Sequence, residues 1–109
     1  MNEPHDLNVG TWAATVQQAV NAIRSVSSTS HMILLPGTDF TAVGAFINND
    51  SGPSLLAVKN PDGSTTNLIF DVHQYLDSDS SGRSPECTQN GVNNLNTLGN
   101  WLRSNGRQA

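Results

Sequence analysis

Leu68-Ile69-Phe70-Asp71-Val72, followed by His73-Gln74-Tyr75, is the stretch from which the fold can be inferred. Its first five residues form a short, mostly apolar run, the pattern of a strand buried on both faces. Met32-Ile33-Leu34-Leu35, stopped by Pro36-Gly37, is a second run of this type. Strands of this kind are typical of parallel sheets that helices cover.

Segments with helical periodicity separate the two runs and flank them. Thr11 can cap a helix whose apolar residues recur at steps of three and four: Trp12, Val16, Ala19, Val20 and Ile23. Helical spacing also marks residues 38–53, and it returns from Val92 to a stop near Gly106, after a polar loop over residues 78–91. This alternation predicts an α/β fold with a parallel sheet, and residues 107–109 are expected to approach a further strand.

The composition excludes several classes of function. The net charge is −4 with five Lys and Arg residues, so nucleic acid binding has no electrostatic basis. No apolar run approaches the roughly 18 residues that a membrane span needs. Charged residues make up only 13% of the chain, about half the usual share. We expect a loop-rich, extracellular protein.

The single cysteine, Cys87, cannot form a disulfide within the chain. In a secreted protein we expect it to pair with a cysteine outside this stretch, and a buried or free thiol is the alternative.

Glu3 is the first candidate for chemistry. Cleavage of a glycosidic bond needs two carboxyl groups that flank the bond, and one of them protonates the leaving oxygen. Glu3 lies between Asn2 and Pro4, and a neighbouring amide can donate to a sugar hydroxyl. By itself the tripeptide would be equally well explained by an exposed turn.

His73 and Tyr75 follow the second apolar run and alternate, so their side chains point the same way. They could orient a carboxylate and bind sugar hydroxyls, or they could be a structural histidine and an interfacial tyrosine. Phe40 could form a wall that stacks on a sugar ring, with a core position as the alternative. Trp12 and Trp101 lie on helical stripes and are expected in the core.

Other chemistries have less support. The three histidines and one cysteine lack metal-ligand spacing, so neither a metal nor another cofactor is expected. No nucleophile elbow and no phosphate-binding glycine loop occurs. Asp77–Asp79 are expected to form a solvated turn, with weak calcium binding as the alternative.

Several segments together resemble the fungal-type endo-β-1,4-glucanases of glycoside hydrolase family 5. They occur in the family's order and cover essentially the whole chain: Met1–Asp6, Thr11–Gln17, Leu35–Gly37, Asn60–Tyr75 and Trp101–Arg103. The resemblance implies a (β/α)8 TIM barrel and retaining hydrolysis of internal β-1,4-glucosidic bonds in cellulose.

The resemblance also implies roles for particular residues. Glu3 matches the acid/base glutamate at the end of strand four, and His73 and Tyr75 match a pair at the end of strand six that would fix the nucleophile side. Asn2 and His5 would bind substrate. Phe40 stands where the family usually has a tryptophan platform.

The family's nucleophile, a glutamate at the end of strand seven, has no counterpart. Glu86, the only other glutamate, lies in the polar loop before Cys87. Residues 1–109 are therefore expected to be an internal part of a catalytic domain, from the tip of strand four through helix six, with Met1 inside a strand. Alone they are expected to be inactive and marginally folded. The alternatives are a non-catalytic sugar-binding remnant of the barrel, or a mannanase or exoglucanase of the same family.

Overall fold

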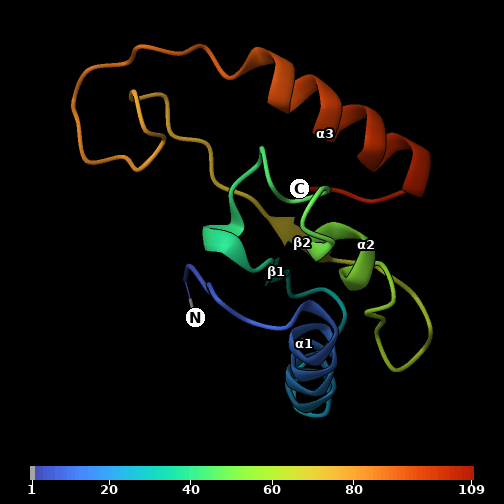
Figure 1. Cartoon of the computed structure of the whole chain (residues 1–109). Helices are drawn as coiled ribbons and strands as arrows, with labels where there is room; N and C mark the ends of the chain where they lie inside the picture. Colours follow the sequence, from blue (N-terminus) through green and yellow to red (C-terminus); the bar gives the residue numbers. More distant parts are fainter. Residues whose placement is uncertain (1) are drawn as a thin grey trace.

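The computed structural model describes residues 2–109, in which helices and strands alternate (Figure 1). The elements are α1 (Val9–Arg24), β1 (Ile33–Pro36), the 3₁₀ turn η1 (Asp39–Thr41), α2 (Ser51–Leu55), β2 (Leu68–Asp71) and α3 (Val92–Asn105). This order confirms the α/β class, both strands and the last helix. Met1, predicted to lie inside a strand, is outside the described residues.

The two strands are parallel neighbours. They pair from Ile33 opposite Leu68 to Pro36 opposite Asp71. Leu35 and Phe70 are buried, whereas Leu34, which points to the other face, is exposed. The prediction of strands buried on both faces is therefore wrong for β1 within residues 2–109, because no described element covers Leu34.

Helix α1 begins two residues before the predicted cap. Asn8 is the N-cap, and its Oδ1 accepts a hydrogen bond from the backbone N–H of Thr11 at 3.0 Å. Thr11 thus lies inside the helix. Val16 and Val20 of the predicted apolar stripe are buried in the core, whereas Ala19 and Ile23 of the same stripe are exposed.

The helix predicted over residues 38–53 is wrong for most of its length. Asp39, Phe40 and Thr41 have φ values of 57°, 57° and 53°, which no right-handed helix can accommodate. Ala42 forms an isolated parallel bridge with His73, turns follow from residue 43 to 49, and the only α-helix in this segment is the short α2. Of the apolar residues at helical spacing in this segment, Val43 and Phe46 are buried in the core, Ile47 is half-buried and Phe40 is exposed.

An aromatic cluster forms the centre of the core. Phe46 lies 5.4 Å from Phe70 and 6.3 Å from Trp101 between ring centroids. Trp12 packs at the edge of the core and donates its Nε1–H to the carbonyl of Pro36 at 2.8 Å. Both tryptophans thus have the predicted structural position.

The last residues run beside β2. The N–H of Phe70 donates to the carbonyl of Gln108 at 2.9 Å, and the guanidinium of Arg107 lies 4.3 Å from the centroid of the Phe70 ring. This hydrogen bond supports the expected approach to a further strand. Among the described residues, no helix is both long enough and apolar enough to span a membrane.

Candidate active site

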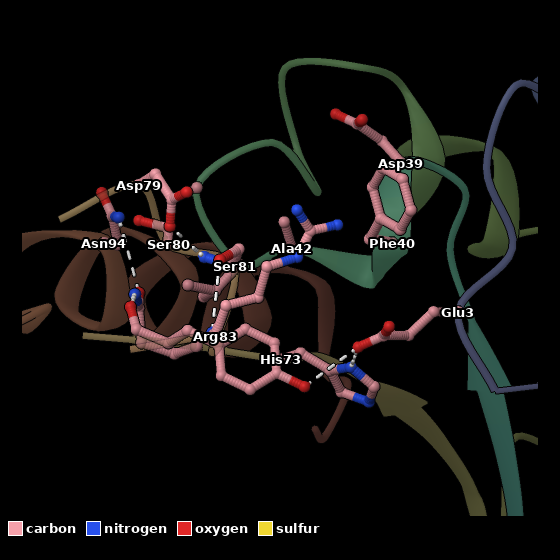
Figure 2. Close-up of a pocket in the computed structure, with 14 residues that line it drawn as sticks. Glu3, Asp39, Phe40, Ala42, His73, Asp79, Ser80, Ser81, Arg83 and Asn94 are labelled. Carbon is pink, nitrogen blue, oxygen red and sulfur yellow. Dashed lines mark hydrogen bonds and ion pairs between the residues drawn. The ribbon is translucent and has the colours of Figure 1, made fainter. Parts of the chain in front are cut away.

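Polar side chains gather where both strands end. Carboxyl ends of parallel strands share one edge of a sheet, and Figure 1 shows the N-terminal segment, η1 and the loop after β2 on the same side. A cavity of about 580 Å³ opens there (Figure 2). Its lining includes Glu3, Asp39, Phe40, His73, Gln74, Tyr75, Asp79, Ser80, Ser81, Arg83 and Asn94.

His73 and Tyr75, in the segment that follows β2, both bind the Glu3 carboxylate. Nδ1 of His73 lies 2.7 Å from Oε1 of Glu3, and the Tyr75 hydroxyl donates to the same oxygen at 3.1 Å. Figure 2 shows the Glu3 and His73 side chains pointing toward each other. The structure therefore brings Glu3 together with two residues that lie 70 and 72 positions further along the sequence.

Backbone pairing holds these side chains in place. The N–H of His73 donates to the carbonyl of Thr41, and the N–H of Val43 donates to the carbonyl of His73, both at 2.9 Å. Pro4 is buried beside Glu3, and its carbonyl accepts from the N–H of Phe40 at 2.9 Å. The connection after β1 thus anchors both Glu3 and His73.

His73 lies between two carboxyl groups. Its Nε2 is 3.5 Å from Oδ1 of Asp71, on the side opposite Glu3. Because Asp71, His73 and Tyr75 are two residues apart along an extended segment, they share a face. That alternation could have identified Asp71, which the sequence analysis did not include among the site residues.

The hydrogen bonds to Glu3 favour its ionised form. The bond from His73, and then the bond from Tyr75, lower the pKa of the Glu3 carboxyl below its usual value. The same bond to Glu3, together with its negative charge, raises the pKa of the Tyr75 hydroxyl. Within residues 2–109 these bonds therefore favour the carboxylate form of Glu3, and an acid role needs a further negative charge nearby.

His73 and Tyr75 face the same cavity as Glu3, and both contact its carboxylate. The end of β2 and the N-terminal segment meet because both are anchored to the connection after β1. That the pair also fixes the nucleophile stays a prediction, because residues 2–109 contain no counterpart of that glutamate.

The remaining predicted residues are only partly in the cavity. Phe40 lines it, is 49% exposed and stacks on the ring of His5, with the centroids 4.6 Å apart. His5 is therefore connected to the cavity through Phe40. Asn2 is exposed and is outside the cavity lining.

Two residues of the loop after β2 lie outside the site. Glu86 does not line the cavity, and Cys87 is an exposed, free thiol. In the described part of the chain no three His, Cys, Asp or Glu side chains come close enough to hold a metal ion.

The family model for cellulase (glycosyl hydrolase family 5) matches residues 1–109. The chain belongs to this family. The described fold is correspondingly part of a TIM barrel. The crystal structure of Cel5A (EG2) from Hypocrea jecorina superposes with a TM-score of 0.97 at 59% identity, and the match covers 100% of this chain and 33% of that one.

Curated members of the family give the same picture. Endoglucanase EG-II of Hypocrea jecorina is 59% identical over 110 residues, which cover 100% of this chain and 26% of that protein. Endoglucanase 1 of Saitozyma flava is 51% identical over 109 residues, 100% of this chain and 32% of that protein. The chain thus spans about a quarter to a third of the length of these relatives.

Proposed function

We propose that the whole protein is an endo-β-1,4-glucanase that cleaves internal bonds of cellulose with retention, and that residues 1–109 are the part of its catalytic domain that carries the acid/base. The observation that carries this proposal is the Glu3 carboxyl, which His73 and Tyr75 hold in a cavity at the carboxyl edge of parallel strands. Barrel enzymes place their chemistry at this edge.

In the proposed mechanism Glu3 first protonates the leaving sugar oxygen. A second carboxylate, from outside residues 1–109 and about 5 Å from the Glu3 carboxyl, attacks the anomeric carbon, so that the glycosidic bond breaks and a glycosyl-enzyme forms. That negative charge would raise the pKa of Glu3 and oppose the effect of His73 and Tyr75. After proton donation Glu3 is ionised, the form that both hydrogen bonds stabilise. It then deprotonates a water molecule that attacks the anomeric carbon, which breaks the bond to the second carboxylate and returns the proton to Glu3.

The other predicted residues bind the substrate in this proposal. Phe40 presents an exposed aromatic face to a sugar ring, and His5 covers part of the Phe40 ring and orients it. Asn2, which is exposed in residues 2–109, donates to a sugar hydroxyl in the complete barrel, where further strands surround the site. No cofactor takes part.

Two further properties belong to the same proposal. The protein acts outside the cell, since cellulose is a polymer that cells do not import. Cys87 is exposed on the loop and pairs with a cysteine outside residues 1–109. Mass spectrometry of the unreduced, digested whole protein would identify that pair, and a free Cys87 thiol there would contradict it.

A chimera tests the activity. Residues 1–109 replace the matching 110 residues of EG-II from Hypocrea jecorina, which the 59% identity and closely similar fold support. Glu3→Gln should lower kcat on carboxymethylcellulose by about 10²–10⁴-fold, because it removes the transferable proton.

Glu86→Gln is the matched control, since Glu86 lies outside the cavity, and its kcat should stay within about twofold of the parent. A chimera that hydrolyses cellulose equally well with Gln at position 3 would refute the proposal. Hydrolysis of mannan without hydrolysis of glucan would show that the substrate is mannan and not cellulose.

A further inference from the structure

The loop between β2 and α3 is organised around one buried carboxylate. Asp77 is 2% exposed, while residues 78–90 are all exposed. Its carboxylate accepts from the backbone N–H of Gly82 at 3.0 Å and of Ser84 at 3.2 Å, and from the Ser81 hydroxyl at 3.4 Å. The loop thus folds around Asp77 rather than around apolar side chains.

Hydrogen bonds also close the two ends of this loop. The N–H groups of Thr88 and Gln89 both donate to the carbonyl of Leu76, at 2.8 and 3.0 Å. The side-chain amide of Gln89 donates to the carbonyl of Asp77 at 2.7 Å. Residues 76–89 therefore form a closed unit whose shape does not depend on the packing of a helix.

Gly82 is the residue through which this unit packs against the Tyr75 ring of the active site. Its φ is +73°, and a Cβ built on it would lie 2.6 Å from the Tyr75 ring, which is closer than side chains approach. The backbone of the loop thus contacts the ring whose hydroxyl donates to Glu3.

The residue that this arrangement brings to the cavity is Arg83 (Figure 2). Among residues 2–109 its guanidinium makes no hydrogen bond and no ion pair, so all five donors are available. The charged side chains that share the cavity lining are the carboxylates Glu3, Asp39 and Asp79.

We propose that Arg83 is a glucan-binding residue of this site, and that Asp77 is the positioning residue that holds it there. The proposal rests on the proposed function. Sugar hydroxyls both donate and accept, so a chain of glucose units can accept from Arg83 and donate to Asp39 and Asp79. Arg83 lies on the loop and does not contact the reacting carboxyl groups. We therefore expect it to bind the substrate and the transition state equally well.

The EG-II chimera with cellopentaose as the substrate tests Arg83. Arg83→Ala should raise KM about tenfold, the loss of roughly one such hydrogen-bonding group, with kcat nearly unchanged. Arg83→Lys should give a KM between those of the parent and Arg83→Ala, since lysine keeps the charge but loses the planar guanidinium group. Arg103→Ala removes an exposed arginine from the far end of α3 and should leave KM unchanged.

Asp77→Asn tests the positioning role, with Asp62→Asn as its matched control. Asp62 likewise accepts a backbone N–H, from Ser64 at 2.9 Å, but lies in a turn outside the cavity. Asp77→Asn should raise KM in the same direction as Arg83→Ala. The double variant should have the KM of Arg83→Ala alone, because Asp77 acts on KM through Arg83.

A KM for Arg83→Ala equal to that of the parent would overturn the proposal, and so would single-variant effects that multiply in the double variant. Calorimetric binding of cellopentaose to the Glu3→Gln chimera, with and without Arg83→Ala, separates this result from the proposed function. Weaker binding there supports the role of Arg83 even if Glu3 is not the acid, and equal binding contradicts it.

Discussion

The connections that follow β1 and β2 reach the same cavity but are built in different ways. The connection after β1, residues 37–50, is tied to the core by buried side chains. In the loop after β2, residues 76–91, only Asp77 is buried, and residues 78–90 are all exposed. The connection after β1 contains three consecutive residues with positive φ, Asp39–Thr41, whereas the loop after β2 contains the buried carboxylate of Asp77.

Buried hydroxyls and apolar packing stabilise the first connection. Thr41, with no exposed surface, donates its hydroxyl to the carbonyl of Asp71, and the N–H of Thr38 donates to the hydroxyl of Ser51 at 3.0 Å. Phe46 packs beneath. Many contacts keep the three consecutive positive-φ residues, Asp39–Thr41, in place, as strained backbone requires.

The second connection shows how little burial a binding loop needs. One carboxylate satisfies several donors, so a single substitution can disorder the loop while the core stays intact. The cavity thus has a rigid side, which carries Phe40, and a side that can be disordered separately from the core, which carries Arg83.

Phe46→Ala would test the rigid side most severely. The side chain is fully buried between Phe70 and Trp101, so we expect a loss of about 3–5 kcal/mol in the free energy of unfolding. Urea denaturation of the chimera measures it.

Phe40→Ala, in the same connection but half exposed, is the control and should cost less than about 1 kcal/mol. Equal costs for the two phenylalanines would mean that this connection is not anchored through Phe46.

Thr41→Val should cost about 1–3 kcal/mol, because it leaves the Asp71 carbonyl and the Gly37 N–H without their buried partner. Valine has the same shape and the same positive-φ strain, so the hydroxyl alone changes. Thr15→Val, on the exposed face of α1, is the control and should be almost neutral. A neutral Thr41→Val would show that the hydroxyl does not hold the turn.

Asp77→Asn should leave the melting temperature nearly unchanged while the amides of Gly82 and Ser84 exchange faster. The N–H donors of the loop, that of Gly82 foremost, lower the pKa of Asp77. A lowered pKa means that the stabilisation is complete above the ordinary carboxyl value and is lost as the pH falls through the lowered one. The parent loop should therefore lose protection only in acid.

Amide exchange followed by NMR checks this, with Asp62→Asn as the variant that should disturb only its own turn. Unchanged exchange at Gly82 after Asp77→Asn would contradict an organising role for Asp77.

Gly82→Ala is the most local change. The added methyl group would push against the Tyr75 ring and weaken its hydrogen bond to Glu3, so the pKa of Glu3 should rise. Gly63→Ala has the same kind of positive φ, +81°, with no atom within 4 Å of the new Cβ, and controls for backbone strain. NMR titration of the Glu3 carboxyl measures the difference, and identical titration curves for the two variants would exclude contact through Tyr75.

Much of the site could be predicted because its residues are close in sequence or are brought together by the geometry of parallel strands. Alternation along Asp71, His73 and Tyr75 predicts a shared face, and parallel strands bring their polar ends to one edge. The direction of the Glu3 pKa could not be predicted, since it depends on which of the distant partners bonds to its carboxylate.

The apolar patterns of the sequence were enough to predict the two strands and α3, because the spacing of apolar side chains reports which side of an element faces the core. The turn at Asp39–Thr41 and the burial of Asp77 had no such signal. The first depends on Pro4 and Asp71, far away in the chain, and the second on backbone N–H groups that face a carboxylate only after the loop has folded. A residue sequence does not show directly which backbone groups will meet, and these groups decide both features.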